Sequence, residues 1–96
     1  MQFDFKWDPG KAVQNRRKHG VSFEQAATVF LDPHALSMFD EGHSDAEDRW
    51  ITLGISVAGN LLAVHHTFEE IEGTLVRIRI ISSRKATRSE TRQYSE

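Results

Sequence analysis

The sequence predicts an α+β fold, in which a mostly antiparallel sheet carries an N-terminal helical hairpin on one face and a short C-terminal helix. Two capped helix patterns fill most of residues 8–33, three apolar or β-branched segments follow residue 49, and a capping box lies near the C-terminus. A chain of 96 residues supports one hydrophobic core. We therefore expect a single domain over residues 1–96.

The N-terminal elements follow from capping signals. Residues 3–7 alternate apolar and polar side chains, which is the period of a half-buried strand. The Asp-Pro pair at residues 8–9 provides an N-cap and a first helical residue, and Gly20 is a natural end for that helix. Ser22 and Gln25 have the spacing of a capping box for a second helix, which ends at the next Asp-Pro pair. The two helices joined at a glycine predict the hairpin.

The rest of the chain reads mainly as strands. The expected strands cover residues 34–39, 49–57, 61–68 and 74–82. Residues 40–48 form an acidic loop, residues 58–60 carry a hairpin-turn signal, and residues 69–73 make the following turn. Thr87 and Glu90 have the spacing of a capping box for the C-terminal helix.

Composition excludes several classes of protein. The chain has no cysteine, which removes disulfides, thiolate metal sites and a cysteine nucleophile. Its first residues lack the basic and apolar regions of a signal peptide, and no apolar run approaches the roughly 20 residues of a membrane span. We expect a soluble, cytoplasmic protein with no membrane segment.

The formal net charge of −2 hides a strong segregation of charge. Residues 1–31 hold five Lys or Arg and three Asp or Glu, residues 32–72 hold one and nine, and residues 73–96 hold six and two. Two basic ends therefore flank an acidic middle, and this distribution matters more for partner choice than the sum does. An ordinary solvated surface with offsetting charges remains the alternative.

Arg77 and Arg79 are the strongest functional candidates. Two arginines at positions i and i+2 of a strand project from the same face. If Val76 and Ile78 face the helices, the arginines lie on the open face of the sheet, where guanidinium groups can bind phosphates in a bidentate manner. The alternative is a pair of surface arginines balanced by the glutamates of residues 69–72.

His65 and His66 lie on the neighbouring strand and point to opposite faces. The alternation with Leu62 and Val64 places His66 inward and His65 outward, and a bulge would exchange them. Histidine suits proton transfer near neutral pH, although a lone strand histidine is more often structural.

Two other polar segments carry less chemistry. Lys18 and His19 end the first helix, where cations interact well with the helix dipole. The acidic run of residues 40–48 does not have the spacing of an EF-hand or of a zinc site, so we expect a solvated loop there, no metal and no cofactor.

A pattern over nearly the whole chain resembles the BrnT toxin family. It comprises Phe5, Trp7, Asp8, Lys11, Asn15, Lys18-His19-Gly20-Val21, Phe23-Glu24, Ala26, Phe30, Asp32-Pro33, Arg49, Leu53-Gly54, His66-Thr67, Arg77-Ile78-Arg79-Ile80-Ile81-Ser82, Arg84-Lys85-Ala86-Thr87, Glu90, Arg92 and Tyr94. The departures are Ser83, where the family usually has alanine, and the longer turn at residues 69–73.

This resemblance implies a fold similar to the RelE ribonuclease toxins and the role of a toxin in a type II toxin–antitoxin system. Such a toxin cleaves RNA without a metal ion, arrests growth and is neutralised by a ribbon-helix-helix antitoxin, here a BrnA-like one. A 2:2 complex with that antitoxin is expected, which binds operator DNA only through the antitoxin.

The resemblance also suggests a role for each candidate residue. Arg77 and Arg79 would stabilise charge on the phosphate, and His66, or His65 if the register is reversed, would transfer a proton. The expected catalytic set is His66, Arg77, Arg79 and Arg49. The expected RNA-binding set is Lys18, His19, His65, Arg84 and Lys85.

Two other functions remain open. The same surface could serve a non-catalytic protein-binding module or a co-repressor that acts only with its antitoxin partner, which would suit the net negative charge. Growth arrest on expression without a partner separates this function from a toxin. A DNA-binding regulator in its own right is less favoured, because no helix-turn-helix with a basic recognition helix is clear.

Overall fold

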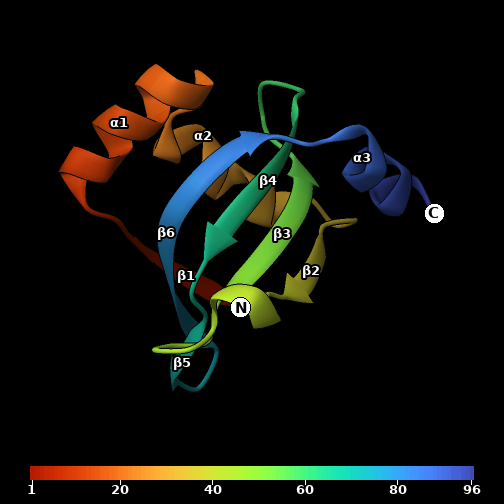
Figure 1. Ribbon diagram of the computed structural model, residues 1–96. Coiled ribbons are helices and arrows are strands. Elements are labelled where there is room, and N and C mark those ends of the chain that lie inside the picture. The colour runs from red at the N-terminus through yellow and green to blue at the C-terminus, as the bar shows by residue number, and fades with distance from the viewer.

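The computed structural model describes residues 1–96 and contains one six-stranded sheet and three α-helices (Figure 1). In chain order the elements are β1 (Gln2–Lys6), α1 (Pro9–His19), α2 (Phe23–Thr28), a 3-10 turn (Val29–Leu31), β2 (Leu36–Phe39), a second 3-10 turn (Glu41–His43), β3 (Trp50–Ile55), β4 (Leu61–His66), β5 (Glu69–Glu72), β6 (Leu75–Lys85) and α3 (Arg88–Ser95).

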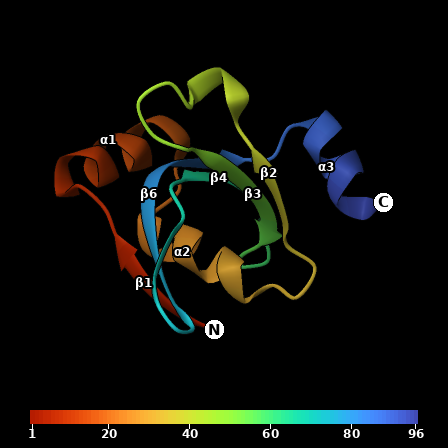
Figure 2. The same ribbon diagram turned by 90° about the horizontal axis from the view of Figure 1, so that it is seen from below.

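The sheet has the strand order β1-β6-β4-β3-β2, and β5 pairs with the first part of β6. Every neighbouring pair is antiparallel except β1 and β6, which are parallel. This confirms the mixed α+β fold and the mostly antiparallel sheet of the prediction. The sheet curves around α2, while α3 lies outside the curve near the opposite side from α1 (Figure 2).

One predicted turn is wrong. Residues 69–73 were expected to form only a turn, but Glu69–Glu72 form strand β5, and the turn itself is at Gly73, whose φ is +56°. The segment Glu-Glu-Ile-Glu lacks the alternation and β propensity that mark a strand. It pairs because β4 ends at His66, which leaves the first residues of β6 without a neighbour on that side.

The capping signals set the helix starts as predicted, but α2 ends at Thr28 and a 3-10 turn, Val29–Leu31, fills the rest of the way to the Asp-Pro pair where the helix was expected to end. The Asp8 carboxylate accepts a hydrogen bond from the Lys11 backbone nitrogen at 2.9 Å, and Gly20 ends α1 with a φ of +71°. The Ser22 hydroxyl caps α2, and Thr87 with Glu90 forms a complete capping box on α3. Both α1 and α2 contact β6. Their pairing as a helical hairpin stays a prediction.

The core lies between α2 and the inner face of the sheet. Its buried members come from α2 with its flanking turns and from alternate positions of β4 and β6: Val21, Phe23, Ala26, Val29, Leu62, Val64, Val76, Ile78 and Ile80. Because side chains alternate along a strand, Arg77 and Arg79 must lie on the outer face when Val76, Ile78 and Ile80 lie inside. Burial of the core thus fixes which face carries the cations.

The second half of β6 has a free edge, which α1 closes. Strand β1 pairs only with residues 75–79 of β6. Beyond this region the buried Asn15 side chain bonds the Ser83 backbone: its amide nitrogen donates to the Ser83 oxygen at 2.9 Å, and its amide oxygen accepts from the Ser83 nitrogen at 3.0 Å. The same amide nitrogen donates to the Val21 oxygen at 3.0 Å. One side chain therefore substitutes for a missing strand.

A bulge interrupts β6 beside this point. His65 pairs with Ser82, whereas His66 pairs with Ile80, so Ile81 is the extra residue. Before the bulge, the side chains of Ile78 and Ile80 face the core. After it the alternation is shifted by one residue, so that Ser83 faces the core and is fully buried.

Replacing Asn15 by alanine tests the edge closure. The variant leaves the Ser83 N–H and two carbonyl oxygens without their partner in a buried site, so we expect the free energy of unfolding to fall by about 2–4 kcal/mol. Urea denaturation measures it. The exposed neighbour provides a control, because Gln14→Ala should change stability by less than about 0.5 kcal/mol. Equal stability of the two variants would contradict this role of Asn15.

Candidate RNA-cleavage site on the outer face

Arg77 and Arg79 project into a hollow at the outer face of β6. The hollow has a volume of about 370 Å³ and is lined by Lys6, Glu47, Asp48, Thr67, Phe68, Glu69, Arg77 and Arg79. Lys6 comes from β1, whose register places it beside Arg79. The predicted placement of the two arginines on one face is therefore confirmed. Part of the Arg77 guanidinium is already hydrogen-bonded, because its Nε donates to the Asp4 carboxylate at 2.9 Å.

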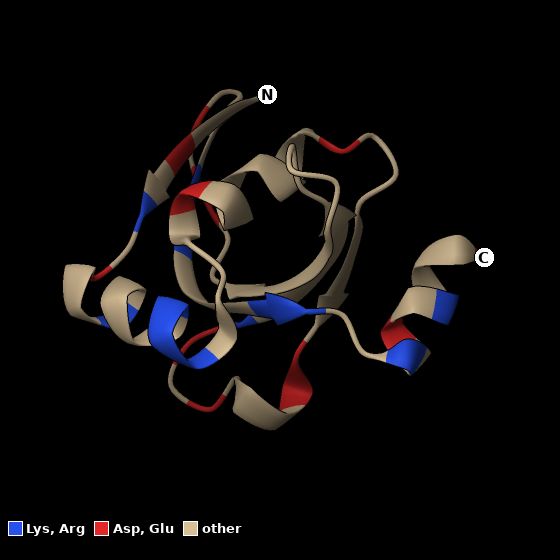
Figure 3. Cartoon of the chain, turned by 90° about the horizontal axis from the view of Figure 1, so that it is seen from above, with Lys and Arg blue, Asp and Glu red and all other residues tan.

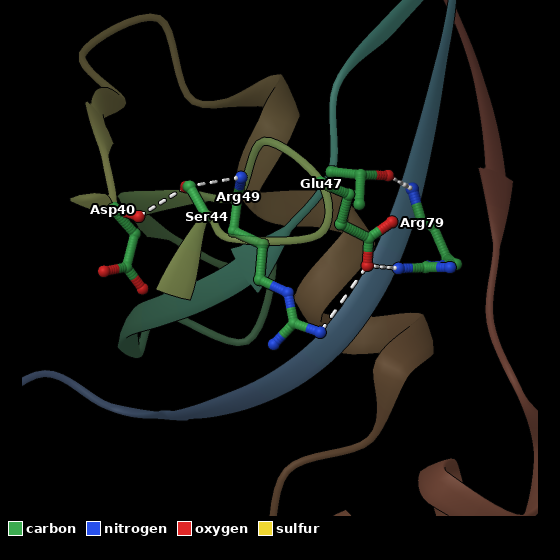
Figure 4. Close-up of polar contacts among 6 residues, drawn as sticks. Asp40, Ser44, Glu47, Arg49 and Arg79 are labelled. Atoms are coloured by element: carbon green, nitrogen blue, oxygen red, sulfur yellow. Dashed lines mark hydrogen bonds and ion pairs between the residues drawn. The ribbon is translucent and has the colours of Figure 1, made fainter. Parts of the chain in front are cut away.

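Glu47 connects Arg79 to Arg49. Its carboxylate contacts the Arg79 guanidinium and lies 3.5 Å from an Arg49 guanidinium nitrogen, so one carboxylate sits between two cations (Figure 4). Hydrogen bonds of Ser44 fix the acidic loop that carries Glu47. The Ser44 hydroxyl donates to the Asp40 backbone oxygen and accepts from the Arg49 backbone nitrogen at 3.1 Å. Two guanidiniums that share one carboxylate can also share one phosphate.

A second hollow of about 250 Å³ adjoins Arg49 on the same face. It is lined by Asp40, His43, Arg49, His65, Ile81 and Ser82. The Arg49 Nε is buried and makes no hydrogen bond, so this guanidinium has a donor without a partner. A buried donor of this kind is costly unless a ligand or water satisfies it.

His65 faces this second hollow, as its register opposite Ser82 and Ile51 requires. Partial burial lowers the pKa of the His65 imidazole, and the nearby Arg84 cation lowers it further. The ring is therefore mostly neutral at neutral pH and can accept a proton. No hydrogen bond within the chain occupies it.

The assignment of His66 as the proton-transfer residue needs correction. Its ring is only 2 % exposed and packs edge-on against Phe30. The Nδ1 atom lies 2.8 Å from the Thr67 backbone oxygen and Nε2 lies 2.7 Å from the Thr52 hydroxyl, so both nitrogens are used inside the fold. Burial lowers the pKa of His66 to about 4. The alternation predicted this inward position correctly. Arg77 and Arg79 lie on the outer face of β6 (the arginine face), so an inward His66 cannot reach a substrate bound there.

The other candidates are spread around the outer face. Lys18 and His19 line a third hollow beside α1. Arg84 makes a bidentate ion pair with Glu90 of α3, at 2.7 and 3.1 Å, which directs its guanidinium toward α3. Lys85 is exposed at the end of β6. The structure thus brings Arg79, Arg49 and His65 into adjoining hollows and leaves Arg84 engaged elsewhere.

The sequence did not single out Glu47. It also did not single out Ile81 and Ser82, which line both the hollow beside Arg49 and the hollow beside α1. The acidic run of residues 40–48 offered no pattern that separates Glu47 from its acidic neighbours. Its position two residues before Arg49 is a weak signal, because Asp48 is closer to Arg49 in sequence. No group of three or more His, Cys, Asp or Glu side chains comes together in a metal-binding arrangement.

Comparison with known proteins decides the family. A family model described as "Ribonuclease toxin, BrnT, of type II toxin-antitoxin system" matches residues 7–90. The chain belongs to the BrnT family. Members of this family are the ribonuclease toxins of type II toxin–antitoxin systems, and each is paired with an antitoxin.

A solved structure agrees with this membership. The 1.1 Å crystal structure of the Brucella abortus ribonuclease toxin BrnT matches with a TM-score of 0.60 and 23% identity, over 92% of this chain and 100% of that one. At this identity the likeness shows the fold alone, and the relation to RelE stays a prediction. No protein of curated function matches. No helix of this BrnT family member is long and apolar enough to cross a membrane.

The buried imidazole of His66 predicts a pH dependence of stability. The pKa of His66 in the folded chain, about 4, lies below its ordinary value of 6.5, so the unfolded chain binds the proton more readily. The neutral His66 ring therefore contributes to the free energy of unfolding. That contribution is complete above pH 6.5 and is lost as the pH falls toward 4. Between about pH 7.5 and pH 5 the free energy of unfolding should fall by about 2 kcal/mol through His66.

Urea denaturation at the two pH values measures this contribution. The variant His66→Gln should lose the corresponding part of the pH dependence, whereas His34→Gln, at an exposed position, should keep it. The same pH dependence in the native chain and in His66→Gln would contradict the assignment.

Removing the charge of Glu47 should strengthen anion binding on the arginine face. The variant Glu47→Gln frees both guanidiniums, so we expect it to bind a non-cleavable 2′-deoxy oligonucleotide more tightly than the native chain does. Fluorescence anisotropy measures the affinity. Asp45→Asn is the matched control, because Asp45 is exposed in the same loop and makes no ion pair. Equal gains from both variants would show a general charge effect.

Proposed function

We propose that this BrnT family member is a metal-independent endoribonuclease that arrests growth. The observation that carries the proposal is the arrangement of two guanidiniums, Arg49 and Arg79, around one anionic group, beside the partly buried imidazole of His65. A phosphodiester would take the place of the Glu47 carboxylate. The family's ribonuclease activity supplies the substrate class.

The reaction is an attack of the RNA 2′-hydroxyl on its own adjacent phosphate. The O2′–P bond forms and the P–O5′ bond breaks, which leaves a 2′,3′-cyclic phosphate and a free 5′-hydroxyl. One proton leaves the 2′-oxygen and one arrives at the 5′-oxygen, so the step needs no co-reactant. The added negative charge appears on the phosphorane oxygens, where preorganised cations stabilise it most.

Each nearby group has a role in this step. His65 is neutral near pH 7 and accepts the 2′-hydroxyl proton, a contribution typically worth about 10²–10⁴-fold in rate. Arg79 and Arg49 bind the phosphate oxygens, and Arg77 adds positive charge from the hollow that it shares with Arg79. His43 lines the hollow of His65, and its Nδ1 lies 2.9 Å from the Asp40 carboxylate. This contact orients the ring of His43, which is the group we propose to give a proton to the 5′-oxygen.

The antitoxin is proposed to be a BrnA-like ribbon-helix-helix protein. Ribbon-helix-helix proteins bind DNA as dimers, and a dimer that holds one toxin on each half gives a 2:2 complex. Operator DNA would then be bound only through the antitoxin. We place this complex, and the RNA that the free toxin cleaves, in the cytoplasm.

Incubation of the purified, antitoxin-free chain with RNA in excess EDTA tests the activity. We expect cleavage that leaves cyclic phosphate ends, a rate lower by about 10²–10³-fold in Arg79→Ala, and a rate lower by about 10²–10⁴-fold in His65→Gln. Arg92→Ala is the control, because Arg92 is an exposed cation of α3 that makes no ion pair. It should cleave like the native chain.

Three outcomes would overturn parts of this proposal. Strict dependence on added magnesium would remove the metal-independent mechanism. Full activity in His65→Gln would remove the proton-transfer role. Absence of cleavage by the native chain, together with normal growth of cells that express it without an antitoxin, would favour the co-repressor or binding module instead.

A further inference from the structure

A third hollow lies between α1 and β6 and is not used by the proposed reaction. It has a volume of about 270 Å³ and is lined by Lys11, Gln14, Asn15, Lys18, His19, Ile81 and Ser82. Ile81 and Ser82 also line the hollow that holds Arg49 and His65. The two hollows therefore meet over the same two residues of β6.

The cations of this third hollow are free, unlike those of the arginine face. No ion pair involves Lys11 or Lys18, whereas Arg49, Arg77, Arg79 and Arg84 each contact a carboxylate. Figure 3 shows Lys and Arg along α1 and at the end of β6, with Asp and Glu spread over several loops and helices around them. An unpaired ammonium group is fully available to a phosphate.

The fold fixes the position of this hollow. Asn15 bonds the Ser83 backbone on one side and the Val21 oxygen on the other, which holds α1 directly beside Ser82. The bulge places Ile81 in the floor that both hollows share. The aliphatic Ile81 side chain between the two polar hollows offers a small apolar contact to a nucleobase, while the phosphates reach cations on either side.

We infer that the α1–β6 hollow is a second binding subsite for single-stranded RNA. The strand passes from the Arg49–His65 hollow over Ile81 and Ser82 to Lys11 and Lys18, which bind the phosphate that flanks the one to be cleaved. This inference rests on the proposed function and adds one contact, Lys11, to it. A single strand fits because its bases can turn away from each other on so short a surface, which a duplex does not allow.

The salt dependence of binding tests the subsite separately from cleavage. The probe is a 2′-deoxy octanucleotide, which lacks the attacking hydroxyl and stays intact, and its affinity is measured by fluorescence anisotropy over a series of salt concentrations. Lys11→Gln and Lys18→Gln should each weaken binding and reduce the slope of log affinity against log salt by about 0.7. Arg88→Gln is the matched control, because Arg88 is an exposed cation without an ion pair at the start of α3. It should leave the slope unchanged.

A second variant tests the shared floor. Ser82→Glu places a carboxylate where the two hollows meet and should weaken binding of the octanucleotide more than either lysine variant does. An unchanged slope in Lys11→Gln together with unchanged affinity in Ser82→Glu would overturn the subsite. Loss of cleavage in Arg79→Ala with no effect of Lys11→Gln would keep the proposed function and reject the subsite. A reduced slope in Lys11→Gln from a chain that cleaves no RNA would keep the subsite and reject the proposed function.

Discussion

The hydrogen bonds of the Asn15 side chain hold together the parts of the molecule that matter for function. Strand β6 extends past β1, and its free edge would expose backbone groups at the point where the site begins. The Asn15 amide satisfies the Ser83 N–H and C=O and reaches Val21 as well. Because the same contacts fix α1 beside β6, they also fix Lys11 and Lys18 relative to Ser82.

The alternation of side chains along β4 gives the two adjacent histidines different positions. His66 completes the core through Thr52 and the Thr67 carbonyl, and burial holds it neutral by lowering its pKa. His65 lies on the outer face, where burial is partial and no bond within the chain occupies its ring. The outer face carries arginines although the chain has a net charge of −2, and one carboxylate there, Glu47, contacts both Arg49 and Arg79.

Local signals in the sequence were sufficient for most of the fold. The caps at Asp8, Ser22 and Thr87 act within one helical turn, and the alternation along β6 decides by itself which face carries Arg77 and Arg79. Strand β5 could not be predicted, because its pairing depends on where β4 ends. The position of Glu47 depends on how a loop folds back over the sheet, and the engagement of the His66 ring depends on its contact with Thr52 of β3. These are long-range effects that no local pattern encodes.

We expect RNA to bind across the outer face of β6, between α1 and the acidic loop. Backbone ¹⁵N NMR spectra recorded during titration with a 2′-deoxy octanucleotide locate the bound strand, because every residue reports separately. The largest shifts should occur at Ile81 and Ser82, with further shifts at Lys18 and in the loop around Glu47. Shifts confined to β2 and α3 would contradict it, since no residue of those elements lines any of the three hollows.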